Sequence, residues 1–121
     1  MRVVYLPGRL PDDAALNFAI LQKLGVSLLE VREDDLSSVT AAIDQANVIV
    51  DALYGTGFHG AVTGLPAALL IAMNAAGKPV VSVDLPSGVD ADTARGRGRR
   101  VAEDPIAVAL GDVRAPGCRS L

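Results

Sequence analysis

The sequence predicts an α/β fold in which a doubly wound, mainly parallel sheet lies between two helical layers, a three-layer αβα arrangement. Strand-like and helix-like patterns alternate along the chain, as in parallel sheets with crossover helices. Half of the residues are apolar, but only two Phe, two Tyr and no Trp are present, so the core is aliphatic, as suits strands buried on both faces. The 121 residues suffice for one hydrophobic core, and we expect a single domain over residues 1–121.

The first half of the chain predicts two strands and two helices in alternation. Residues 2–6 (RVVYL) form a β-branched run that indicates a strand. A helix is expected between Pro11, which suits the first helical turn, and Gly25, which suits a helix end. Residues 26–31 (VSLLEV) indicate the second strand, and apolar residues at helical spacing over residues 35–46 predict the second helix.

The second half continues the same alternation. Residues 47–54 (NVIVDALY) form an apolar run interrupted only by Asp51, and we expect this segment to be the central strand. Good helix formers over residues 65–76 predict the third helix, and residues 79–83 (PVVSV) predict the next strand. Residues 106–110 indicate a weaker final strand.

Composition argues against several classes of partner. The formal net charge of −3 offers little to a nucleic-acid backbone, so we expect no nucleic-acid binding. The longest apolar stretch, residues 65–73, is far shorter than the roughly 20 residues of a membrane span, so we expect no membrane insertion. The single cysteine, Cys118, and the lack of a leader pattern at the start favour a cytoplasmic protein.

Two loops follow predicted strands and carry the polar and glycine residues that could bind a ligand. The first, residues 51–60, has the sequence DALYGTGFHG, and the second, residues 84–90, has the sequence DLPSGVD. Ligands of open α/β sheets bind outside the carboxyl ends of the strands. Because both loops follow strands of a parallel sheet, we expect them to open on the same edge and to share one site.

The glycines of the first loop also fit a dinucleotide-binding fingerprint. Gly55, Gly57 and Gly60 have the spacing G-x-G-x-x-G, and Asp84 lies about 20 residues further on, where that fingerprint has an acid. In the fingerprint the third glycine packs at the start of the helix, whereas residues 61–64 intervene here. An NAD-binding oxidoreductase domain is therefore kept as an alternative.

Asp51 stands out because a carboxylate in a buried strand costs free energy unless it has partners. Two interpretations stay open at this point. Asp51 could accept backbone N–H groups from its own loop, or it could bind a cation together with the hydroxyl of Ser87. Both are oxygen ligands, which suit a hard ion rather than zinc.

The two loops and their strands resemble the two characteristic segments of NAD(P)H-hydrate epimerases. Residues 48–57 (VIVDALYGTG) match the first segment, residues 80–92 (VVSVDLPSGVDAD) match the second, and a looser similarity runs over residues 2–117. The resemblance implies a Rossmann-like domain and an isomerase that interconverts the R and S forms of NADHX and NADPHX, which are hydrated nicotinamide cofactors. It also implies a role in metabolite repair, with an NAD(P)HX dehydratase as functional partner.

The resemblance further implies roles for residues at matching positions. Asp51 and Ser87 resemble the family's potassium ligands, so K⁺ is the implied cofactor. We expect Asp84 to be the catalytic acid and base, because a positioned carboxylate can serve a hydroxyl group that leaves and returns beside the ring nitrogen. The matching substrate-binding residues are Gly55, Thr56, Gly57, Phe58, His59, Gly60, Ala61 and Asp84.

The sequence departs from the family pattern at both ends. The family has an upstream helix, strand and loop of approximate sequence GGxNNGGDG, and residues 101–117 differ from its V-x-A-D-x-T-V-x-F-G-x-x-K-P-G segment. We therefore expect a truncated domain with weakened epimerase activity and an exposed sheet edge that favours a homo-oligomer. A non-catalytic scaffold of the same fold, binding a nucleotide or a protein, is the main alternative.

Overall fold

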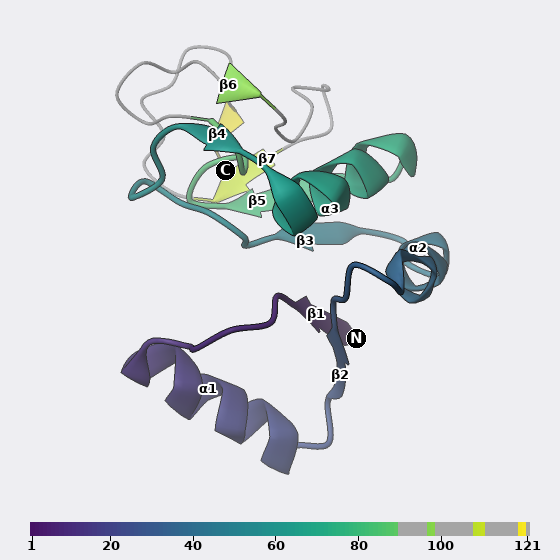
Figure 1. Ribbon diagram of the computed structural model, residues 1–121, viewed down its shortest axis with the longest axis vertical. Coiled ribbons are helices and arrows are strands. Elements are labelled where there is room, and N and C mark those ends of the chain that lie inside the picture. Colours follow the sequence, from purple (N-terminus) through teal and green to yellow (C-terminus); the bar gives the residue numbers. More distant parts are fainter. Residues whose placement is uncertain (90–96, 99–107, 111–118, 121) are drawn as a thin grey trace. The chain divides into compact units, whose positions relative to one another are not determined.

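The structure is a computed structural model that describes residues 1–89, 97–98, 108–110 and 119–120. The chain divides into two compact units, Met1–Ala42 and Ile43–Leu121, and each is described by itself (Figure 1). The expectation of one domain over residues 1–121 stays a prediction.

The first unit begins with a parallel β-α-β element. Strand β1 (Arg2–Tyr5) pairs in parallel with strand β2 (Ser27–Glu30), and Tyr5 lies opposite Glu30. Helix α1 (Asp12–Lys23) connects the two strands (Figure 1). The strand, helix and strand expected in this region are thus confirmed.

Local sequence explains where α1 begins and ends. Pro11 is the residue before the helix, and the carboxylates of Asp12 and Asp13 occupy its first turn, where they favour the positive end of the helix dipole. Lys23 lies in the last turn, at the negative end. Gly25 then adopts a φ of 67°, a left-handed conformation that few residues other than glycine adopt without strain, and the helix ends.

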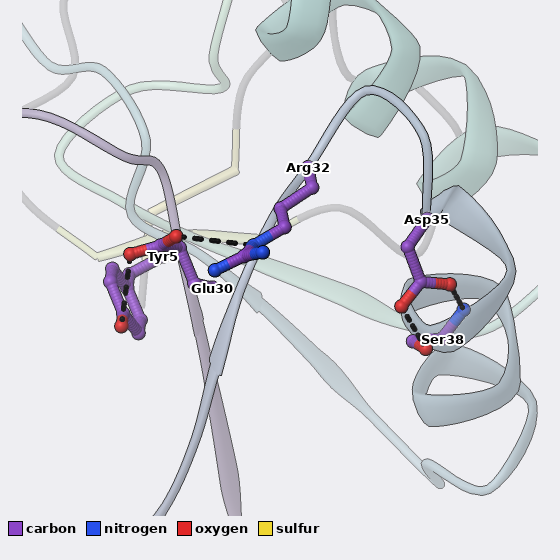
Figure 2. A network of polar contacts seen from close by, with 5 residues as sticks. All are labelled: Tyr5, Glu30, Arg32, Asp35 and Ser38. Carbon is purple, nitrogen blue, oxygen red and sulfur yellow. Dashed lines mark hydrogen bonds and ion pairs between the residues drawn. The ribbon is translucent and has the colours of Figure 1, made fainter.

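Polar and aromatic contacts connect the carboxyl ends of β1 and β2. The Tyr5 hydroxyl donates to Glu30 Oε2 at 3.4 Å, and Arg32 Nε lies 3.4 Å from Glu30 Oε1 (Figure 2). The Tyr5 ring also meets the ring of Phe18 from α1 edge to face, with centroids 4.8 Å apart. Because Arg32 is mostly exposed, its ion pair contributes little to stability.

Helix α2 (Leu36–Asp44) is capped by the residue that precedes it. Asp35 Oδ1 accepts the Ser38 N–H at 3.3 Å, and Oδ2 accepts the Ser38 hydroxyl at 2.6 Å (Figure 2). Asp35 Oδ1 also accepts the Ser37 hydroxyl at 2.8 Å. The hydrogen bond from the Ser38 hydroxyl, followed by that from Ser37, lowers the pKa of Asp35 below its ordinary value.

The second unit contains a parallel sheet with the strand order β3-β5-β7-β8 and a separate parallel pair, β4-β6. In chain order these strands are β3 (Ile49–Asp51), β4 (Ala61–Val62), β5 (Val80–Val83), β6 (Arg97–Gly98), β7 (Val108–Leu110) and β8 (Arg119–Ser120). The register of β3 and β5 places Asp51 opposite Ser82, so these two side chains lie on the same face of the sheet.

Helix α3 (Gly64–Ala75) supplies much of the core of the second unit. Leu69, Leu70 and Met73 are its buried residues, and they recur at the spacing of one helical face. Gly77, at a φ of 61°, follows the helix end. Among the described residues of this unit, the other buried apolar ones are Ile43, Val62, Val80, Leu85 and Val89.

The structure confirms the α/β class and the parallel pairing, with several corrections. The strand expected over residues 47–54 is shorter, and in the four-stranded sheet it is an edge strand instead of a central one. Val50 in its middle is 61% exposed, and after Asp51 the chain turns as the Asp51 carboxylate accepts the N–H of Leu53. Strands β4, β6 and β8 were not expected. Within the described part of the chain, no helix is long and apolar enough to span a membrane.

The packing of α3 predicts a contrast between two adjacent residues. Leu70→Ala should lower the free energy of unfolding by about 2–5 kcal/mol, because Leu70 is fully buried and its truncation leaves a cavity. Ile71→Ala should cost about 1 kcal/mol or less, because Ile71 is 45% exposed. Urea denaturation measures both, and equal costs would contradict the placement of α3.

The cap of α2 predicts a pH dependence. The folded state lowers the pKa of Asp35 below its ordinary value of 3.8. The cap therefore stabilises the helix at a pH above 3.8, and this stabilisation is lost as the pH falls through the lowered pKa of the folded state. The Ser38 amide, followed by NMR, should lose its hydrogen-bonded shift over that range. Asp35→Ala should remove this transition and Asp34→Ala should leave it in place; a Ser38 amide that does not titrate would refute the cap.

Candidate active site

The carboxylate of Asp51 is buried at the end of β3 and makes four described hydrogen bonds. Oδ1 accepts the Ser87 hydroxyl at 2.6 Å and the Leu53 N–H at 3.3 Å. Oδ2 accepts the Ser87 N–H at 2.8 Å and the Ser82 hydroxyl at 3.1 Å. The side chain is 1% exposed, so these bonds replace the water that the carboxylate loses on folding. We call Asp51, Ser82 and Ser87 the Asp51 cluster.

Ser87 connects this cluster to the loop after β3. Its hydroxyl donates to Asp51 and accepts the N–H of Tyr54 at 3.0 Å. Ser87 belongs to the loop over residues 84–89, which we call the Asp84 loop, and every residue from Leu85 to Val89 in it is buried. The segment that follows β3, residues 52–60, is the glycine loop.

Asp84, at the start of the Asp84 loop, contacts the glycine loop. It is partly exposed, and its Oδ2 accepts the N–H of Thr56 in the glycine loop at 2.7 Å. Its φ of 71° is the only positive value of a non-glycine residue in the described chain. Such a conformation costs free energy and persists only when surrounding contacts maintain it, and it is often found at functional sites.

The two aspartates therefore bind each other's loops. Asp51, at the end of β3, accepts hydrogen bonds from Ser87 in the Asp84 loop, and Asp84, at the end of β5, accepts one from Thr56 in the glycine loop. Because β3 and β5 are adjacent and parallel, their carboxyl ends meet. The expectation that the two loops lie side by side is confirmed.

Gly55 lies directly beside the Asp84 carboxylate. A Cβ atom at this position would lie 2.5 Å from Asp84 Oδ2, nearer than side-chain contacts allow. At Gly57 a Cβ atom would meet nothing within 4 Å. The absence of a side chain at Gly55 therefore allows Asp84 to reach the Thr56 N–H.

The other expected binding residues occupy the same loop. Phe58 is half-buried, its N–H donates to the Gly55 carbonyl at 3.0 Å, and its ring lies 4.5 Å from that of Tyr54 between centroids. The exposed members of the expected set are Thr56, Gly57, His59, Gly60 and Ala61. Strand β4 begins at Ala61 and α3 only at Gly64, so Gly60 does not open a helix as the dinucleotide fingerprint requires.

Both sequence-based interpretations of Asp51 remain compatible with this geometry. Asp51 accepts backbone N–H groups, as the first interpretation states, and it lies beside the Ser87 hydroxyl, as the second requires. Ser82 was not among the residues expected at the site. The signal that could have revealed it is a serine among valines in a strand expected to be buried.

Comparison with known proteins defines the class to which this fold and site belong. The chain has an α/β fold with two aspartate-bearing loops at adjacent strand ends, and its residues 1–111 match the family described as YjeF-related protein N-terminus. The chain belongs to this family, which confirms the resemblance indicated by the two motifs.

Individual repair enzymes and epimerases are also similar in sequence to this chain. The chain is 46% identical over 90 residues to the bifunctional NAD(P)H-hydrate repair enzyme of Moorella thermoacetica, covering 74% of this chain and 17% of that protein. It is 31% identical over 107 residues to the NAD(P)H-hydrate epimerase of Anaerococcus prevotii, covering 85% of this chain and 49% of that protein. It is 38% identical over 92 residues to the NAD(P)H-hydrate epimerase of Rhodobacter capsulatus, covering 74% of this chain and 40% of that protein. The chain thus spans less than half the length of each of these relatives.

The contact at Gly55 predicts a contrast between two glycine substitutions. Gly55→Ala should displace the Asp84 carboxylate from the Thr56 N–H and lower the free energy of unfolding by about 1–3 kcal/mol. Gly57→Ala, with open space around it, should stay within about 0.5 kcal/mol of the original chain. Urea denaturation and the NMR shift of the Thr56 amide measure the two effects. Equal behaviour of the two variants would show that Asp84 does not approach Gly55 in solution.

Proposed function

We propose that this chain carries the epimerase site that interconverts the R and S forms of NADHX and NADPHX. The observation that carries the proposal is the partly exposed Asp84 carboxylate, held beside a glycine loop by the Thr56 N–H. Support comes from the relatives named NAD(P)H-hydrate epimerase and from the match of both loops to their family.

Asp84 is suited to the proton transfers that epimerisation needs. In the hydrated cofactor, a hydroxyl group sits on the carbon beside the ring nitrogen. Protonated Asp84 gives its proton to that hydroxyl, the C–O bond breaks, water leaves, and the nitrogen lone pair forms the C=N bond of an iminium ion. Water then adds to the other face of the carbon and returns a proton to the carboxylate. Such acid and base catalysis contributes about 10²- to 10⁴-fold in rate.

The hydrogen bond to Thr56 assigns the two oxygens of Asp84 different tasks. Oδ2 accepts the Thr56 N–H, and an oxygen that faces a donor is a poor place for a proton. We therefore assign the transferred proton to Oδ1. The φ of 71° at Asp84 and the missing side chain at Gly55 maintain this orientation.

The glycine loop is suited to bind the phosphates of the substrate. Backbone N–H groups of glycine-rich loops can approach an anion without obstruction by a Cβ atom. Around Gly57 and Gly60 a Cβ atom would meet no neighbour within 4 Å, so this stretch of backbone is open to a ligand. We propose that Gly55, Thr56, Gly57, Phe58, His59, Gly60 and Ala61 form the substrate-binding segment.

The Asp51 cluster fits the chemistry of a potassium site. Its side chains offer carboxylate and hydroxyl oxygens, which are the ligands of hard cations. Within the described residues, no cationic side chain forms an ion pair with the buried Asp51. We propose that Asp51 and Ser87 hold K⁺, which would supply a positive charge beneath the two loops and balance the carboxylate.

The proposal extends to the context of the reaction. An epimerase that only interconverts two forms needs an enzyme that consumes one of them, so we propose an NAD(P)HX dehydratase as its functional partner and the cytoplasm as the compartment. Apolar side chains of β3 and β5, Val50 and Val83, are exposed. A homo-oligomer that covers them is part of the proposal, and light scattering would detect it.

The activity is tested with the pure R epimer of NADHX, using a dehydratase that consumes only the S epimer as the reporter. The chain should exceed the spontaneous rate of epimerisation, and K⁺ should raise the rate more than Na⁺ at equal ionic strength. Asp84→Asn should reduce the catalysed rate by about 10²-fold or more, because an amide cannot transfer the proton. The exposed Asp34→Asn is the control and should retain the original rate.

If Asp84→Asn keeps the original rate, the acid and base role of Asp84 is wrong. If the chain never exceeds the spontaneous rate yet binds NADPHX or a protein partner, the non-catalytic scaffold replaces the epimerase as its function.

A further inference from the structure

Ser82 is a polar residue in β5, whose other residues are valines. It lies in β5 between Val81 and Val83 and is 0% exposed. A buried hydroxyl costs free energy unless it is hydrogen-bonded. The register of the sheet explains its presence, because Ser82 lies directly opposite Asp51 and its hydroxyl donates to Asp51 Oδ2 at 3.1 Å.

Ser82 differs in one respect from the other described donors to Asp51. The N–H of Leu53 and both donors of Ser87 belong to loops, whereas Ser82 belongs to a strand paired in register with β3. A donor on a paired strand is fixed by the backbone hydrogen bonds of the sheet, and a donor on a loop is not. Ser82 can therefore fix the rotation of the carboxylate independently of the loops.

The orientation of the carboxylate determines what Ser87 can do. With Oδ2 held by Ser82, Oδ1 faces the Ser87 hydroxyl at 2.6 Å. Because the Ser87 hydroxyl donates its hydrogen to Asp51, its oxygen has a lone pair free to accept the Tyr54 N–H, 3.0 Å away. A continuous series of hydrogen bonds thus runs from the strand interior to Tyr54, directly before Gly55.

We propose that Ser82 is a positioning residue of this site, which orients Asp51 so that Ser87 holds the start of the glycine loop. The effect on loop order follows from these contacts alone. The effect on potassium binding rests on the proposed function, because it requires that Asp51 and Ser87 bind the ion.

The test compares Ser82→Ala, Ser82→Thr and Val80→Ala in the 121-residue chain by amide hydrogen exchange. Ser82→Ala should speed exchange at Tyr54 and Ser87 by roughly threefold to tenfold relative to the Leu70 amide of α3, the range expected for one lost hydrogen bond. Ser82→Thr keeps the hydroxyl and should restore slow exchange. Val80 is buried on the same face of β5, lies opposite Ile49 and has no hydroxyl to donate, so Val80→Ala should leave the Tyr54 to Leu70 ratio unchanged.

A potassium titration, followed by the Tyr54 amide shift at constant ionic strength, adds a second measurement. Ser82→Ala should need a several-fold higher K⁺ concentration for half of the shift change. Unchanged Tyr54 exchange in Ser82→Ala, or equal loss of protection in Ser82→Ala and Ser82→Thr, overturns the positioning role. If exchange responds as expected but the original chain shows no response to K⁺, the positioning role stands and the proposed potassium site fails.

Discussion

The buried carboxylate of Asp51 is the constraint on which the site depends. An unpaired carboxylate in this position would cost several kcal/mol, and the chain avoids this cost by surrounding it with donors from β5, the Asp84 loop and the glycine loop. Satisfying one charge therefore fixes the positions of three segments. Removing any one donor would leave a buried acceptor poorly satisfied, so the cluster specifies one arrangement of the loops.

This arrangement brings a second carboxylate to the edge of the sheet in a defined orientation. Asp84 reaches the Thr56 N–H only because its backbone adopts a left-handed conformation and because Gly55 has no side chain. The two acids thus have different environments: Asp51 is enclosed and Asp84 is partly exposed. An enclosed acid suits a structural or ion-binding role, and a partly exposed one suits proton exchange with a substrate.

The sequence predicted the local features of this protein better than its long-range ones. Alternating patterns and end signals such as Pro11, Gly25 and Gly77 located the three helices to within a few residues, because these signals act on their own neighbourhood. The two loops and their acids were recognised from their motifs. Ser82 was missed because its role depends on the residue opposite it in register, and the φ of Asp84 is maintained by contacts with a distant loop.

The Asp51 and Asp84 contacts are expected to behave as one coupled unit and not as two independent contacts. A double-mutant cycle of Asp51→Asn and Asp84→Asn, measured by urea denaturation, tests it most directly. Asp51→Asn weakens the cluster that orients Ser87 toward the Tyr54 N–H, and Asp84→Asn weakens the contact with the Thr56 N–H. Both changes loosen the same pair of loops, so the loss caused by the second should depend on the first. If the two contacts are coupled, the coupling free energy is about 0.5–3 kcal/mol. If the free-energy costs of the two single substitutions add up to that of the double substitution within about 0.3 kcal/mol, the two contacts are not coupled.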